Sequence, residues 1–264
     1  MAGNILRMAI PMTIAQMVNV LYSVVDRFFI GHIDGASSMA LTGVGIVFPI
    51  ISVITAFTNL FGMGGAPLCS IARGRQDLDL AGRIQGSSCY MLGLTAVVLT
   101  AIGVLFMRPI LEVFGASPDT YPYARDYFSV YIWGTPFAML GLGMNGFINS
   151  QGFGRVGMVT ITAGAVVNAV LDPVFIFVLH QGVRGAAIAT VISQLGSCLY
   201  VLHFLFGPVP QVRITFGGYN LRIMGRVLVT GLTPFLIIAV DNVMIIALNA
   251  VLQRYGGAEQ GDLL

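Results

Sequence analysis

Charge is the property that this sequence has least of. Only 9% of its 264 residues are charged, and all thirteen basic residues are arginine. A soluble domain carries about 25% charged residues, and so apolar a chain could not cover a water-facing surface with polar groups. The net charge of +2 provides no strong field for nucleic acid. The composition therefore excludes an ordinary soluble domain and gives no reason to expect a nucleic-acid partner.

Cysteine and enzyme motifs are also scarce. The three cysteines, Cys69, Cys89 and Cys198, show neither metal-ligand spacing nor a disulfide framework. We interpret them as small hydrophobic side chains in packed helices. The sequence has no P-loop, no nucleophile elbow and no HExxH motif. We therefore expect neither an enzyme nor a bound cofactor.

Long apolar runs dominate what remains. The chain is 56% hydrophobic, its mean hydropathy is +0.88, and a membrane-spanning helix needs about 20 apolar residues. The first run lacks a small-residue cleavage site and is too long for a signal peptide, so we expect it to be a retained helix. The sequence predicts an all-α polytopic membrane protein. Its seven candidate helices are 5–30, 41–68, 84–107, 122–148, 156–180, 184–206 and 223–252.

The arginines predict the orientation in the membrane. Eight fall on the side of the N-terminus and five on the opposite side. Because cytoplasmic loops carry an excess of basic residues, we expect a cytoplasmic N-terminus and a multi-pass protein of the plasma membrane. The eight are Arg7, Arg73, Arg75, Arg83, Arg155, Arg213, Arg222 and Arg226, and the five are Arg27, Arg108, Arg125, Arg184 and Arg254.

A faint internal repeat links the first and last predicted helices. Residues 5–26 can be laid on 228–249, which pairs Pro11 with Pro234 and Asn19 with Asn242. Transporters are often built from such repeated halves. The Pro- and Gly-rich segment 207–222 has the composition of a linker between two units. Because only one helix follows it, we expect the seven helices to be a fragment of a two-fold design.

Three acidic residues lie well inside the predicted helices: Asp26, Asp172 and Asp241. A charge within the membrane is costly, so such residues are candidates for function. In the first helix, Gln16, Asn19, Tyr22 or Ser23, and Asp26 recur at three- and four-residue spacing and share one face. The alternative is that this stripe only holds packed helices together.

A second polar group lies in the fifth predicted helix. Asn168 and Asp172 are four residues apart, and Pro173 removes the backbone donor that would satisfy the carbonyl of residue 169. Amide, carboxylate and carbonyl oxygens are hard ligands suited to an alkali cation, and a desolvated carboxylate could carry a proton instead. Thr190 in the next helix could complete the oxygen site, although a lone threonine more often bonds a neighbouring helix.

Asp241 in the seventh predicted helix has two interpretations that we weigh evenly. It could pair with a helix that this chain lacks, or it could be a second acidic group facing a central cavity together with Gln16, Asn19 and Tyr22.

Several segments together resemble the multidrug and toxic compound extrusion (MATE) transporters. Helix 1 reads PMTIAQMVNVLYSVVDRFFIGHIDG, with a proline, a mid-helix aspartate and a following glycine. GMGGAPLCSIARGRQDLDLAGRI is similar to the family's small-residue segment and loop between helices 2 and 3. NGFINSQGFGR is similar to the end of its helix 4, and NAVLDPVFIF with GVRGAAIAT to its helix 5–6 signature. The similarity covers nearly the whole chain.

The resemblance implies a twelve-helix fold in two six-helix lobes. Residues 1–206 would be the N-terminal lobe, 207–222 a cytoplasmic inter-lobe loop, and 223–264 the start of a second lobe, whose remainder or a second chain would be a partner. It implies a site for Na⁺ or H⁺ at Asp26, Asn168, Asp172 and Thr190, with Pro11 and Pro173 as hinges.

The implied activity is cation-coupled antiport. The transporter would export bulky, often cationic organic compounds by alternating access, in the bacterial cytoplasmic membrane and in contact with the lipid bilayer. Two alternatives stay open. One is a lipid-linked-sugar flippase of the same superfamily, although such proteins need cationic cavity residues and the predicted helices 2 to 7 have none deep inside. The other is a membrane fragment that transports nothing.

Overall fold

The computed structural model describes residues 2–33, 37–215, 217 and 219–255, and in these ranges it is helical, with no strand. Residues 256–264, the end of the predicted second-lobe segment, lie outside the described residues, as does the side chain of Ser23. The elements are α1 (Ala2–Ile30), α2 (Ser37–Gly74), α3 (Leu78–Leu105), α4 (Met107–Val113), α5 (Tyr121–Ser150), α6 (Gly154–Pro173), the π-helical turn η1 (Val174–Val178), α7 (Gly182–Phe206) and α8 (Leu221–Tyr255).

The predicted helices are present, with three differences. Each of the seven predicted ranges falls on a long helix, and α2 and α3 begin several residues earlier than predicted. The short helix α4 was not predicted because it continues the apolar run of α3 and has too few residues for a period of its own. The turn η1 was not predicted either, because the apolar run continues without interruption through Pro173.

Five described helices are long and apolar enough to cross a membrane, judged by length and composition. The other two predicted spans correspond to α1 and α5, and α5 carries Arg125 and Asp126 in its first turns. Large apolar side chains are exposed along many helices, as expected for surfaces that face hydrocarbon. The chain is therefore a multi-pass membrane protein. The five helices that are long and apolar enough to cross a membrane are Ser38–Gly74, Leu78–Leu105, Gly154–Val178, Gly182–Phe206 and Leu221–Ile245.

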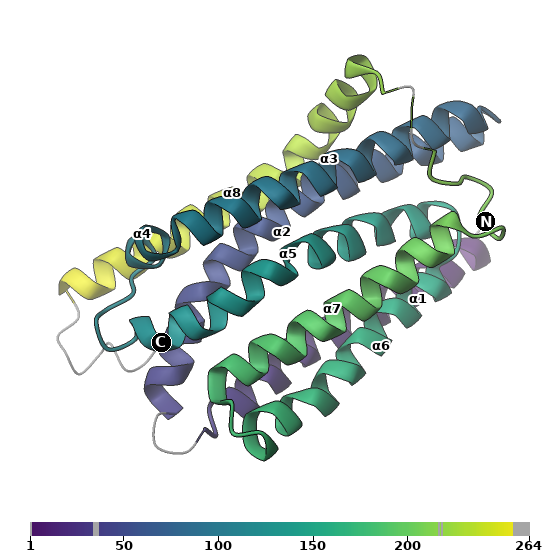
Figure 1. Ribbon diagram of the computed structural model, residues 1–264. Helices are drawn as coiled ribbons and strands as arrows, with labels where there is room; N and C mark the ends of the chain where they lie inside the picture. Colours follow the sequence, from purple (N-terminus) through teal and green to yellow (C-terminus); the bar gives the residue numbers. More distant parts are fainter. Residues whose placement is uncertain (1, 34–36, 216, 218, 256–264) are drawn as a thin grey trace.

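The helix α5 lies in the middle of the bundle. It packs against α2 and α3 on one side and against α7 on the other, while α1 packs against α6 (Figure 1). Helix α8 lies along α2 and α3, away from α6 and α7. This arrangement places α1, α5, α6 and α7 around a common interior, and the residues of the predicted cation site come from α1, α6 and α7.

Glycines let α2 and α8 approach backbone to backbone. A Cβ atom on Gly64 would collide with the carbonyl oxygen of Val227 and lie 3.0 Å from the Cα of Gly231. A Cβ atom on Gly231 would collide with the carbonyl oxygen of Leu60. Such small-residue contacts are typical of helices packed within a membrane.

The segment between α7 and α8 is held against the bundle by one side chain. Gln151, which caps α5, accepts a hydrogen bond from the Val212 amide at 3.0 Å and donates one to the Val212 carbonyl at 3.1 Å. Its Nε2 also donates to Gln85 Oε1 at 3.3 Å. Val212 is buried, and Gly86 leaves room for the carbonyl of Thr215. This part of the predicted linker is therefore docked on the helices.

Candidate functional site

One face of α6 carries the polar residues of the site. Thr160, Gly164, Asn168 and Asp172 follow one another at intervals of four residues, so they form one row on the helix. Asn168 and Asp172 are only 1% and 0% exposed, whereas α6 turns Val166, Val167 and Val170 outward. The helix thus presents a polar row to the protein interior and an apolar face to its surroundings.

The backbone changes directly after the carboxylate. The α-helix α6 ends at Pro173, and the π-helical turn Val174–Val178 begins at the next residue. Proline cannot donate the backbone hydrogen bond of a regular helix, and π-helical turns are frequent at functional sites. Asp172 therefore lies at a junction between two helical geometries.

Asn168 connects the two helices of this site. Its Nδ2 donates to Asp172 Oδ1 and to Thr190 Oγ1 of α7, both at 3.3 Å. Thr190 is 2% exposed. The Thr190 hydroxyl oxygen accepts the hydrogen bond from Asn168 Nδ2, so buried polar atoms connect α6 to α7 at this site.

Asp26 enters the same interior from α1. It is 3% exposed, and its carboxyl group interacts electrostatically with that of Asp172. Arg27 forms no salt bridge with Asp26 and acts on it at longer range; its guanidinium lies over the Phe48 ring, 4.5 Å from the centroid. Within the described structure, Asp26 Oδ1, Asn168 Oδ1 and Asp172 Oδ2 are buried and accept no hydrogen bond. Buried acceptors of this kind are unusual unless a proton or a cation completes them.

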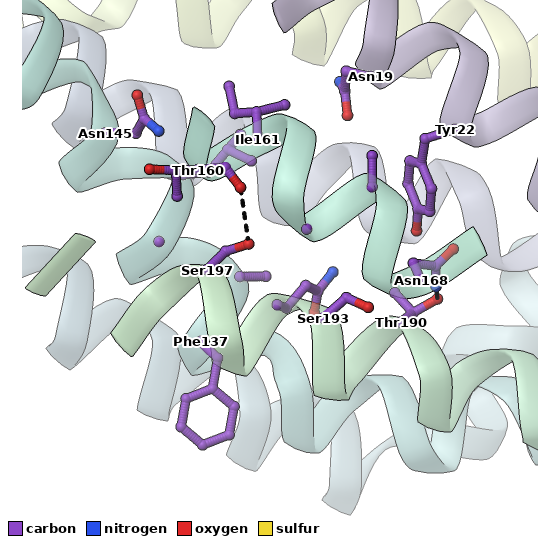
Figure 2. Close-up of a pocket in the computed structure, with 16 residues that line it drawn as sticks. Asn19, Tyr22, Phe137, Asn145, Thr160, Ile161, Asn168, Thr190, Ser193 and Ser197 are labelled. Atoms are coloured by element: carbon purple, nitrogen blue, oxygen red, sulfur yellow. Dashed lines mark hydrogen bonds between the residues drawn. The ribbon is translucent and has the colours of Figure 1, made fainter. Parts of the chain in front are cut away.

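Tyrosines cover the site. The hydroxyls of Tyr22 and Tyr127 both reach Thr190. Figure 2 shows the Tyr22 side chain extending from α1 toward Asn168 and Thr190. Tyr127 stacks on Tyr131 with ring centroids 6.0 Å apart, and Tyr131 accepts a hydrogen bond from Gln194 Nε2 at 3.5 Å. The carboxylates are thus screened by phenol groups that can donate hydrogen bonds.

A cavity of about 130 Å³ adjoins Asn168 and Thr190, and we call it the site cavity. Asn19 and Tyr22 of the predicted stripe line it (Figure 2). The other lining residues are Phe137, Ala138, Gly141, Leu142, Asn145, Thr160, Ile161, Gly164, Ala165, Ser193, Gln194 and Ser197.

A second cavity of about 600 Å³ lies between α1, α2, α5 and α6. Gln16 lines this second cavity and is absent from the lining of the site cavity. Asp241 is exposed on α8 and lines neither of them. The remaining lining residues of the second cavity are Ala15, Gly62, Met63, Ala66, Pro67, Ser70, Gly146, Asn149, Ser150, Gly154, Gly157, Met158 and Ile161.

Several polar residues of the site were not predicted from the sequence. On α7, Ser193 or Gln194 and then Ser197 follow the predicted Thr190 at helical spacing, a signal that was available in the sequence. Tyr127 and Asn145 on α5 gave no comparable signal. A tyrosine near a helix end is typical of a membrane interface, and a single asparagine is typical of helix packing.

The ligand chemistry of the site is that of oxygen donors. Among the described residues, no group of three His, Cys, Asp or Glu side chains could hold a metal ion. Two carboxylates, one amide oxygen and one hydroxyl suit a proton or an alkali cation better than a transition metal.

A sequence model of the MatE family matches residues 11–174, which include α1 from Pro11 onward, all of α2 to α6, and both buried carboxylates. The chain belongs to the MatE family. The multidrug export protein MepA of Staphylococcus haemolyticus is 27% identical over 250 residues, which cover 94% of this chain and 55% of MepA. This MatE chain therefore spans about half the length of the curated relatives that it matches.

Solved transporter structures have the same fold. A multidrug resistance MATE family transporter in an outward-facing conformation matches with a TM-score of 0.88 and 27% identity. The match covers 98% of this chain and 57% of that transporter. A MOP superfamily transporter from Pyrococcus furiosus, described as having a binding pocket of reverse polarity, also has a TM-score of 0.88 and 27% identity, over 97% and 56% of the two chains. The resemblance found in the sequence is confirmed, and so is the fold of a six-helix MATE lobe followed by a further helix.

Proposed function

We propose that this chain is the cation-binding lobe of a multidrug exporter that couples the entry of H⁺ or Na⁺ to the release of bulky organic compounds. Asp26 and Asp172 would take up the cation, and Asn168 and Thr190 would position it. The proposed activity is that of a whole transporter, because this chain matches only about half the length of its multidrug export relatives. Supporting it, the relatives with the same fold include multidrug transporters.

One observation carries the proposal. Two buried carboxylates from α1 and α6 interact electrostatically, form no salt bridge with an arginine among the described residues, and keep free acceptor atoms. Two negative charges in a buried site repel each other, so the site is stable only when at least one charge is neutralised. A cation or proton that binds there removes this repulsion, which is a large change in free energy at one point of the lobe.

The mechanism that we propose is alternating access. Binding of the cation would change how α1 packs against α6, and Pro11 within α1 and Pro173 beside Asp172 would be the positions where the helices bend. A ligand drives such a change only if its affinity differs between the two states. We place the N-terminus, the ends of α2 and α5, and the start of α6 in the cytoplasm, on the side of the larger number of arginines.

The cavity lining argues against the flippase alternative. Neither the site cavity nor the second cavity has an arginine among its lining residues. An anionic lipid-linked headgroup would need cationic partners in a site from which water is largely excluded. Neutral polar and apolar linings suit hydrophobic organic compounds instead.

The test is neutralisation of each carboxylate in the protein as its gene encodes it. We expect Asp172→Asn and Asp26→Asn to abolish cation-driven uptake of ethidium into everted membrane vesicles, in which export from the cytoplasmic face is directed into the lumen, while expression is retained. Asp126→Asn is the matched control, because Asp126 is an exposed aspartate of α5 outside the site. Efflux at the wild-type rate in Asp172→Asn would overturn the proposal.

A further inference from the structure

We propose that the coupling cation leaves the carboxylate site through the lobe itself, passing from the site cavity into the second cavity between Asn145 and Asn149. This inference rests on the proposed function, because it names the exit route of the cation that the site binds. The route lies between α5 and α6, and does not depend on the surface where the two halves of a transporter would meet.

The two cavities are neighbours. Ile161 lines both of them, Asn145 lines the site cavity, and Asn149 lines the second cavity. The two asparagines are one turn apart on α5, and Asn149 Nδ2 donates to Asn145 Oδ1 at 3.2 Å. The pair of amides therefore stands at the boundary between the two spaces.

Polar groups lead from the carboxylate site to this boundary. Thr190, Ser193 and Ser197 follow one another along α7, and all three line the site cavity. Ser197 Oγ donates to the Thr160 carbonyl of α6 at 3.4 Å, and Figure 2 shows this contact between Asn168 and Asn145 along the cavity. A cation that leaves Asp172 thus meets hydroxyl and amide oxygens in steps of about one helical turn.

Gly157 sets the width of the boundary. A Cβ atom at this position would lie 2.7 Å from Asn145 Oδ1 and would collide with Asn149 Oδ1. Asn145 Nδ2 donates to the Gly157 carbonyl at 3.2 Å, which orients its Oδ1 toward Asn149. Asn149 Oδ1 is buried and accepts no hydrogen bond from the described residues. It is an oxygen ligand available to a passing cation.

The chemistry of the second cavity suits release. Its lining has Gln16, Asn149, Ser70 and Ser150 as polar residues and no acidic side chain that would retain a cation. It extends to Gly154, beside Arg155 at the end of the bundle. Conduction requires sites that bind strongly enough for the ion to enter and weakly enough for it to leave. The Asp26 and Asp172 carboxylates would bind the cation strongly, and the neutral oxygens of the second cavity would bind it weakly enough for release.

The experiment measures access of Ag⁺, a small monovalent cation that reacts with thiols. The full-length protein is prepared with Cys69, Cys89 and Cys198 replaced by alanine and reconstituted in sealed proteoliposomes. Ser193→Cys reports on the site cavity, and Ser70→Cys reports on the second cavity. With Ag⁺ added on the Arg155 side, we expect both to react. Adding Asn149→Leu should slow the reaction at Ser193→Cys by about tenfold or more, because an isobutyl group blocks the passage.

The control variants distinguish a blocked passage from a misfolded protein. Asn149→Leu should leave the reaction at Ser70→Cys unchanged within about twofold, and Met158→Leu, a change of another lining residue with similar volume, should leave both unchanged. If Asn149→Leu fails to fold, as seen by size-exclusion chromatography, Gly157→Ala narrows the same passage and should slow Ser193→Cys alone. Asn149→Ser, which keeps a small polar group, should preserve access.

The outcomes are distinct from those of the proposed function. The route is overturned if Ag⁺ from the Arg155 side never reaches Ser193→Cys, if Asn149→Leu and Gly157→Ala both leave its rate unchanged, or if Met158→Leu slows it equally. None of these measurements requires transport. If the wild-type protein shows no cation-driven efflux, the proposed function is wrong. The Ag⁺ measurements would still decide whether the route between the two cavities exists.

Discussion

At the scale of single residues, Asn168 is the side chain that organises the site. One nitrogen donates to both Asp172 and Thr190, and the amide oxygen is left without a donor. An amide held in this way presents an acceptor oxygen next to a carboxylate oxygen that also lacks a donor. The Thr190 hydroxyl therefore anchors Asn168, in addition to its proposed role as a cation ligand.

This role predicts different effects for two substitutions of Thr190. Thr190→Val keeps the shape but removes the acceptor, so we expect the concentration of Na⁺ or H⁺ that half-saturates efflux to rise about tenfold, which corresponds to about 1.4 kcal/mol. Thr190→Ser keeps the oxygen and should stay near the wild-type value. Efflux measured against Na⁺ concentration and pH decides between them. Equal cation dependence in the valine variant and the wild type would contradict the anchor role.

The sequence could predict the acidic part of the site but only some of its surroundings. Asp26 and Asp172 stand out because acidic residues are rare in apolar helices, and Asn168 follows from its four-residue spacing to Asp172. Their grouping with Thr190 is what the structure shows, while their role in coupling stays a prediction. Tyr127 and Asn145 could not be predicted, because their positions depend on how α5 packs against α7 and α2.

At the scale of elements, the end of α5 controls the segment that joins α7 to α8. The Gln151 amide group binds both backbone polar groups of Val212, much as a neighbouring strand would. Val212 and Ile214 are buried against the helices, and these contacts keep the segment beside α3. The composition of 207–222 predicted a linker but not its docking, because the partner is a single glutamine at a helix end.

Gln151→Leu should release this segment. Leucine leaves the Val212 amide and carbonyl without partners, which costs about 1–3 kcal/mol for each buried group. We expect a lower unfolding temperature in detergent and faster tryptic cleavage at Arg213. Gln151→Glu keeps an acceptor for the Val212 amide but loses the donor. Its unfolding temperature and cleavage rate should therefore lie between those of the wild type and the leucine variant. Cleavage at Arg213 that is equally slow in all three proteins would show that the glutamine does not hold the segment.

At the scale of the whole molecule, exposed charges mark the two ends of the bundle. Asp79 and Arg83 form an exposed ion pair at the start of α3, with Oδ2 and Nη2 2.9 Å apart. Arg108 and Glu112 form another on α4, with Nε and Oε1 2.8 Å apart. Apolar side chains face outward between them along the helices. The hydrocarbon layer thus lies between these pairs, and the orientation follows from which pair faces the cytoplasm.

Labelling of single cysteines tests that orientation. Asp79 lies in the first turn of α3, Asp119 lies between α4 and α5, and both positions are exposed. A membrane-impermeant maleimide should label Asp119→Cys in intact cells and Asp79→Cys only after the cells are opened, because the arginine-rich side is expected in the cytoplasm. The reverse pattern would invert the topology and leave the fold unchanged.

The glycine contact between α2 and α8 has a consequence for how the protein is made. Residues 60–64 meet residues 227–231, so the chain is synthesised through all of α3 to α7 before this seam can form. Until α8 is made, the face of α2 that carries Gly64 lacks the partner that it has in the folded protein. Gly64→Val or Gly231→Val should therefore act late in biogenesis, when α8 leaves the ribosome, while the helices before it have already assembled.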